Sequence, residues 1–68
     1  MIVTDEELDA TLDRVRRFRA QVAHLRQVET NPTNYRPSVS GFLAEIDRMR
    51  LEAREYLSLH PTEVAAGV

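Results

Sequence analysis

The chain has 68 residues, a formal net charge of −2 and no cysteine, so disulfide bonds are excluded. A chain this short allows one thin domain, and it usually needs disulfides, a metal or self-association to stay folded. The slightly acidic balance excludes a general attraction to nucleic acid, and no stretch approaches the ~20 apolar residues of a membrane span.

The first predicted element is a helix over about residues 5–29. Thr4 and Glu7 fit a capping box, in which the threonine oxygen accepts from the Glu7 N–H and the glutamate reaches back to the cap. Acidic residues follow the cap and Arg26 falls in the last turn, as the helix dipole favours. The segment before the helix has no basic stretch and no apolar run, so it is not a signal peptide and we expect a cytoplasmic protein.

Residues 30–38 are predicted to form a loop. Pro32 and Pro37 stand there among asparagines and threonines, and residues of these types end a helix. Tyr35 is the one large apolar side chain of the segment. We expect it to fold back over the end of the hairpin, with recognition of a partner as the alternative. Ser38 is the predicted cap of the following helix, and Ser40 is the other candidate.

A second helix is expected over about residues 39–59. Gly41 weakens its first turn. His60 precedes Pro61, and the residue before a proline is driven out of the helical conformation, so the helix should end there. Residues 60–68 show no periodic pattern and are predicted to be a mobile tail.

Both predicted helices carry an apolar stripe with alternating spacings of three and four, which is typical of a helix packed on another helix. The first stripe is Leu8, Thr11, Val15, Phe18, Val22 and Leu25, and the second is Val39, Phe42, Ile46, Met49, Ala53 and Tyr56. The short connection predicts an all-α fold, a coiled-coil-like antiparallel hairpin of two helices forming a single domain over residues 1–68. Facing residues of an antiparallel pair have numbers with a nearly constant sum, and the two stripes then pair Leu25 with Phe42, Val22 with Ile46, Phe18 with Met49, Val15 with Ala53, and Thr11 with Tyr56.

The two flanks of this predicted seam differ. On one flank Arg14 and Gln21 should face Glu52 and Glu45, which is a complementary arrangement. The other flank carries leucines that the hairpin cannot cover, together with arginines, and we expect it to be a dimer or partner interface. Its residues are Leu12, Arg19, Arg26, Leu43, Arg50 and Leu57. A second copy of the hairpin could bury this flank, so we expect a homodimeric four-helix bundle. The same register places Arg19 opposite Arg50.

The sequence offers little for catalysis or metal binding. Neither His24 nor His60 has a glutamate three residues before it, which a metal site in a helical bundle would typically need. Both glycines stand alone, so there is no phosphate-binding loop. We therefore expect no enzyme, no cofactor and no metal. The run of residues 14–19 contains four arginines, but successive residues of a helix point about 100° apart, so these side chains spread around it.

Residues 42–57 form a helix rich in Glu, Arg and Leu that ends in Glu-Tyr-Leu. This segment resembles the helical segment with an acidic-tyrosine turn found in some bacterial antitoxins of toxin–antitoxin pairs. The resemblance implies a bacterial protein that binds a larger partner, and it carries over no functional residue. The sequence thus predicts a small protein–protein interaction module, an adaptor or antitoxin-like partner of a larger protein. The alternative is a regulatory dimer that binds nucleic acid through the arginines of its first helix.

Overall fold

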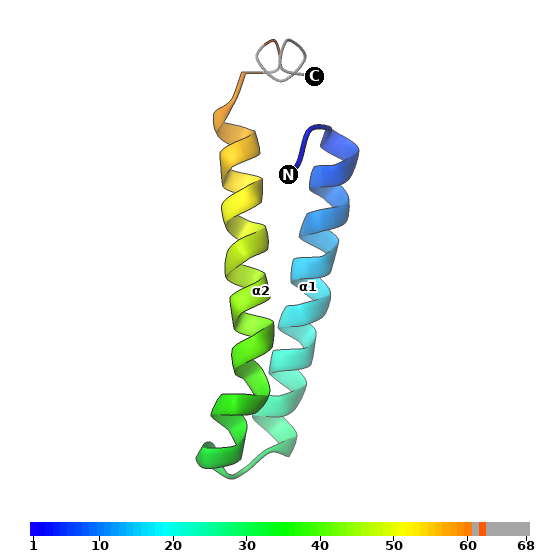
Figure 1. The fold of residues 1–68 in the computed structure, drawn as a ribbon. Coiled ribbons are helices and arrows are strands. Elements are labelled where there is room, and N and C mark those ends of the chain that lie inside the picture. Colours follow the sequence, from blue (N-terminus) through cyan, green and yellow to red (C-terminus); the bar gives the residue numbers. More distant parts are fainter. Residues whose placement is uncertain (61, 63–68) are drawn as a thin grey trace.

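The computed structural model describes residues 1–60 and 62. It contains two helices, α1 (Asp5–Val28) and α2 (Pro32–Ser58), which run antiparallel and side by side along their whole length (Figure 1). The described residues include no strand, and none of their helices is both long and apolar enough to cross a membrane. This arrangement confirms the predicted all-α, two-helix hairpin.

The start of α1 follows the predicted capping box with one difference. The Thr4 hydroxyl oxygen accepts from the Glu7 N–H at 3.1 Å, as expected. The Glu7 carboxylate reaches back one residue further, and accepts from the Val3 N–H at 3.2 Å. This second bond ties the residues before the helix to its first turn, and Ile2 is thereby held against the core with 7% of its surface exposed.

The start of α2 differs from the prediction, because the helix begins at Pro32 and the predicted loop over residues 30–38 is mostly helical. Asn31 is the cap, and its side-chain oxygen accepts from the Thr33 N–H at 3.0 Å. A proline in the first helical position loses no hydrogen bond, since that N–H has no partner within a helix, and its fixed φ suits the helix. Pro32 therefore starts the second helix, whereas the sequence interpretation took it as part of a break.

Pro37 lies inside α2, where its missing N–H removes one backbone hydrogen bond from the second turn. Ser38 is consequently not a cap. Its hydroxyl donates to the Asn34 carbonyl at 2.8 Å, within the helix. Tyr35 is helical and half-buried, and it lines a shallow hollow at the loop end together with Arg26.

The connection between the helices is shorter than the predicted loop, and the observed register differs from the predicted one by one heptad. Phe18 packs edge-to-face on Phe42, with ring centroids 5.6 Å apart and planes at 71°. Val15 belongs to one buried cluster with Ile46, while the predicted partner of Val15, Ala53, lies in the other cluster with Leu8. A heptad pattern repeats every seven residues, so sliding α2 by one heptad keeps the same stripes facing each other. The length of the loop selects between these registers, and the loop was predicted too long.

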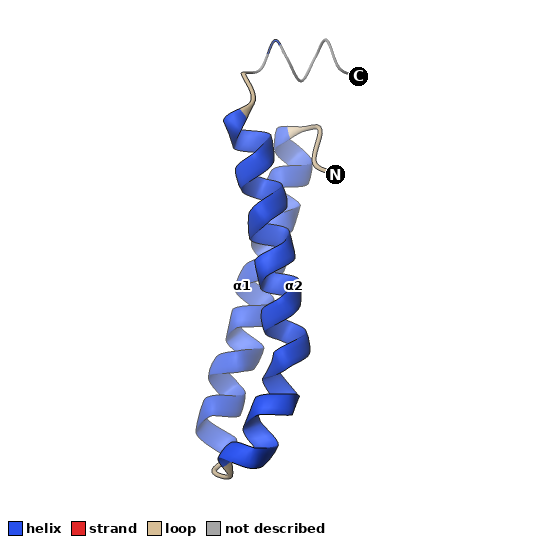
Figure 2. Ribbon diagram, turned by 60° about the vertical axis from the view of Figure 1, so that its left-hand side comes forward, coloured by secondary structure: helices blue, strands red, loops and turns tan. Residues whose placement is uncertain are grey.

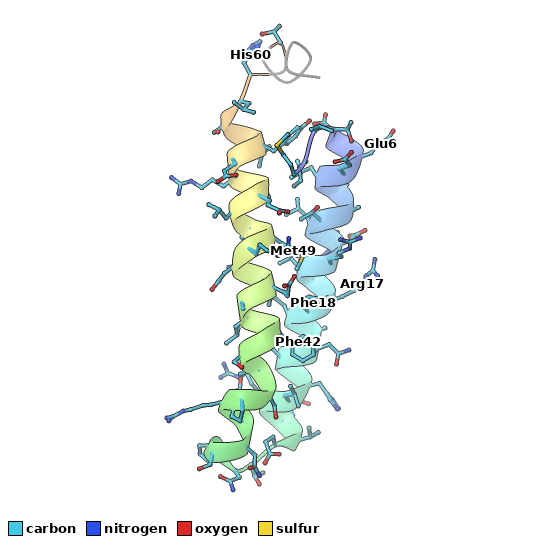
Figure 3. The ribbon with its side chains drawn as sticks, in the orientation of Figure 1. Glu6, Arg17, Phe18, Phe42, Met49 and His60 are labelled. Carbon is cyan, nitrogen blue, oxygen red and sulfur yellow. The ribbon has the colours of Figure 1, made fainter. Side chains whose placement is uncertain are left out.

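Figure 2 shows the two helices joined by a short loop. Six of the seven buried side chains among the described residues form two clusters. The cluster at the open end contains Ile2, Leu8 and Ala53, and the middle cluster contains Val15, Ile46 and Met49. Figure 3 shows Phe18 and Met49 directed into the space between the helices. No described side chain falls below 2% exposure, because two helices cover each other on one side only.

The end of α2 agrees closely with the prediction. The helix ends at Ser58, and the Leu59 N–H donates to the Tyr56 carbonyl at 3.1 Å. Most of the tail predicted to be mobile, residues 61 and 63–68, lies outside the described residues.

Candidate interaction surface

Four of the six residues predicted as an interface, Arg19, Arg26, Leu43 and Arg50, are brought together by the structure. All six recur every seven residues in each helix, beside the apolar stripe. Leu12 is half-buried and packs against the open-end cluster. Leu43 and Leu57 are exposed at 45% and 64%, so the hairpin itself does not cover them. We call these six residues the leucine–arginine face.

Four of the six residues line one shallow groove between the helices. Arg19 and Arg26 come from α1, and Leu43 and Arg50 come from α2. The groove is completed by Val22, Ala23, Ile46 and Asp47. Leu12 and Leu57 do not line it, since they lie nearer the open end. The groove therefore has an apolar floor beside the core and guanidinium groups along its edges.

The arginines of this groove have no intramolecular counter-charge. Within the described part of the chain, no carboxylate oxygen lies within 4.0 Å of Arg19, Arg26 or Arg50. Asp47, the one acidic lining residue, forms no ion pair with a described residue either. Arginine is enriched at protein interfaces, and the exposed leucines beside these arginines add apolar surface that a partner could cover.

The observed register changes which residues of this face lie at the same level. Because Phe18 lies beside Phe42, Arg19 is level with Leu43, and Leu12 is level with Arg50. The prediction that Arg19 lies directly opposite Arg50 is therefore wrong by one heptad. Arg19 and Arg50 instead each have a leucine at their own level, over which the methylene stem can lie while the charged group stays in water.

On the opposite flank, the charged side chains of α2 pair with one another. Arg48 donates to Glu45 at 2.5 Å and to Glu52 at 3.2 Å. The hydrogen bond and the charge of Arg48 lower the pKa of Glu45. Arg14 of α1 lines one hollow together with Glu52, as predicted, but the ion pairs of both glutamates are made by Arg48, which lies three and four residues from them on the same helix.

A contact that sequence reasoning missed closes the open end of the hairpin. The Tyr56 hydroxyl donates to the Asp5 carboxylate at 2.6 Å, which joins the first turn of α1 to the last turns of α2. This hydrogen bond, followed by burial, raises the pKa of Tyr56. The register predicted from the loop placed Tyr56 beside Thr11, one heptad away, so the partner could not be found.

The remaining charged residues that the structure describes are dispersed over the surface. Among residues 1–60 and 62, no group of three or more His, Asp or Glu side chains could hold a metal ion. The arginine run of α1 is dispersed as its spacing predicts. Arg16 pairs with Asp13, and Arg17 extends away from α2 (Figure 3).

Comparisons with protein-family models, with curated proteins and with solved structures found no match. The leucine–arginine face is thus the feature from which a function can be argued.

Proposed function

We propose that this chain is a non-enzymatic protein–protein interaction module of the bacterial cytoplasm, and that it acts as an adaptor or antitoxin-like partner of a larger protein. Its working form is a homodimer, a four-helix bundle in which a second hairpin covers the leucine–arginine face. The observation that carries this proposal is the exposure of Leu43 and Leu57 next to three arginines that form no ion pair with a described residue.

The thin core supports the same proposal. The stripe residues Phe18, Val22 and Leu25 of α1 are only half-buried, so the seam stays open to water on its flanks. A second layer of helices would remove this apolar surface from water at about 25 cal/mol for each Å² covered. A second copy of the hairpin supplies two such helices.

The groove favours protein over nucleic acid as the partner. Its arginines border an apolar strip formed by Val22, Leu43 and Ile46, and no exposed aromatic platform for bases accompanies them. Phosphate backbones are bound by clustered cations with strong salt dependence. An apolar strip flanked by arginines fits an amphipathic helix better.

The test is the solution mass of the protein and of three leucine variants. At micromolar concentration, light scattering should give about twice the chain mass of 7.8 kDa. Leu43→Ser and Leu57→Ser should each shift the equilibrium towards monomer. Leu51→Ser is the matched control, because Leu51 is 54% exposed but lies on the outer side of α2. A folded wild-type monomer, or equal effects of Leu43→Ser and Leu51→Ser, would contradict the proposal.

A further inference from the structure

The first heptad of α2, residues 32–38, contains features that weaken a helix. Pro37 lacks the N–H that would donate to the carbonyl of residue 33, and its ring crowds the same turn. The Ser38 hydroxyl donates back to the Asn34 carbonyl, which competes with the backbone hydrogen bonds of the helix. Serine is a favoured residue at the start of a helix, so Ser38 offers α2 a second starting point beyond Asn31.

The apolar stripes of the two helices fit each other in more than one register. In the observed register Phe18 lies beside Phe42 and Leu8 packs with Ala53. Displacing α2 by seven residues, about 10 Å, keeps the stripes in contact and places Val15 level with Ala53. If residues 32–38 become part of the loop, the connection lengthens by one heptad, which is the length that this displacement needs.

Two exposed apolar side chains have no helical neighbour at their own level in the observed register. Val28, which is 57% exposed, ends α1 beside the first turn of α2. Leu59, which is 48% exposed, follows α2 and lies beyond the start of α1. After a displacement of one heptad, Val28 is level with Val39 and Leu59 is level with Leu8. Both side chains then gain an apolar neighbour, and covering apolar surface is favourable.

The charged residues do not hold the helices in one register. Each ion pair of the described residues joins two residues of the same helix, so the displacement breaks none of them. Each register also places one pair of arginines at the same level, Arg26 with Arg36 in the observed register and Arg19 with Arg50 in the displaced one.

The observed register remains the more stable of the two, because the displacement breaks contacts at the open end. Ile2 separates from Ala53, and the Tyr56 hydroxyl separates from the Asp5 carboxylate. The displaced register is therefore the minor state, reached when the first heptad of α2 unfolds.

We propose that the hairpin exchanges between these two registers, by unfolding of residues 32–38 and displacement of α2 along α1 by one heptad. The exchange alters the leucine–arginine face, since Leu12 moves from the level of Arg50 to the level of Leu57. A molecule that binds this face better in one register shifts the equilibrium towards that register. The exchange takes place within a single hairpin, so this proposal does not rest on the homodimer.

Disulfide trapping tests the displaced register, because the native chain has no cysteine to compete. Ala53→Cys is common to three double variants. With Leu8→Cys it should cross-link in the observed register. With Val15→Cys it should cross-link in the displaced register alone, because in the observed one a heptad separates the two residues, and the Cα atoms of a disulfide lie within ~7 Å. With Val22→Cys it matches neither register, so this control pair reports closure of the unfolded chain.

The rates are compared in a glutathione redox buffer, at a protein concentration at which non-reducing gels show no links between copies. The Val15 pair should cross-link at least about tenfold faster than the Val22 pair, since a local opening costs less than complete unfolding. Adding Pro37→Ala stabilises residues 32–38 as helix, and should bring the two rates close together. Equal rates without Pro37→Ala, or a ratio that Pro37→Ala leaves unchanged, would overturn the proposal.

Amide hydrogen exchange keeps the proposal testable if the cysteine variants do not fold. Leu59 and residues 32–38 lie at opposite ends of the hairpin (Figure 1). Leu59→Ser weakens the displaced register, in which Leu59 is level with Leu8. It should therefore slow the exchange of the amides of residues 32–38 about threefold. Leu51→Ser is the matched control, because Leu51 is 54% exposed and lies on the outer side of α2. Unchanged exchange in Leu59→Ser would show that the first heptad frays without any change of register.

Discussion

Phe18 and Phe42 provide the sharpest test of the register. Their rings lie 5.6 Å apart at 71°, which is a favourable edge-to-face arrangement worth about 0.5–1.5 kcal/mol beyond the area buried. Replacing each ring by leucine, singly and together, should therefore give a coupling free energy in that range. In the alternative register α2 is displaced by one heptad, about 10 Å along the helix, and the rings no longer touch.

The measurement is a double-mutant cycle from urea unfolding followed by circular dichroism, at one fixed protein concentration. The control cycle combines Phe42→Leu with Leu8→Ala, because Leu8 belongs to the open-end cluster and shares no contact with the Phe42 ring. Distant sites should be additive within about 0.5 kcal/mol. A coupling between the two phenylalanines no larger than that of the control cycle would show that the register is not the one described.

Four further tests address the start of α2, its backbone and its final turns. Asn31→Ala should destabilise the protein by about 1 kcal/mol in thermal unfolding, because Asn31 is the cap. Ser38→Ala should be neutral or slightly stabilising, and a larger loss at Ser38 would favour a helix starting there. Gly41→Ala should stabilise by about 0.5–1 kcal/mol, since a Cβ there meets no atom within 4 Å and alanine is the better helix former. With the other tyrosine replaced by phenylalanine, the absorbance titration of Tyr56 should have a higher midpoint in the folded protein than in guanidinium chloride. Its raised pKa stabilises the fold below the unfolded tyrosine pKa of about 10, and that contribution disappears as the pH rises through the folded value. Equal midpoints would mean that the hydrogen bond to Asp5 is not made in solution.

The helices and their faces could be predicted from sequence because periodicity reports them directly. Val15, Ile46 and Met49 are among the stripe residues, and all three are buried. The register of α2 against α1 could not be predicted in this way. A pattern that repeats every seven residues looks the same when one helix is displaced by seven residues. The register depended on the length of the loop, and therefore on whether Pro32 ends one helix or starts the next.

The residues of the leucine–arginine face could be predicted from the sequence. Which of them lie beside one another could not. Leu43 and Leu57 are exposed as expected, because their position beside the stripe does not depend on register. The neighbours of Arg19 and Arg50 do depend on the register, and the sequence therefore predicts the wrong neighbours for these two arginines. The bond between Tyr56 and Asp5 has no sequence signal, since it requires two distant residues to be at the same level.

The brevity of the connection between α1 and α2 has a consequence for the order in which the hairpin closes. The Phe18–Phe42 contact near the loop joins residues 24 positions apart, whereas the bond from Tyr56 to Asp5 joins residues 51 apart. Each doubling of a closed loop costs only about 0.6 kcal/mol in chain entropy, yet contacts near the loop still form first because they close the shortest segments. We expect the helices to zip from the loop outward, so that the cluster around Ile2 closes last. On unfolding the same end should fray first, and the helical amide protons near the Phe18–Phe42 contact should be the last to exchange with solvent.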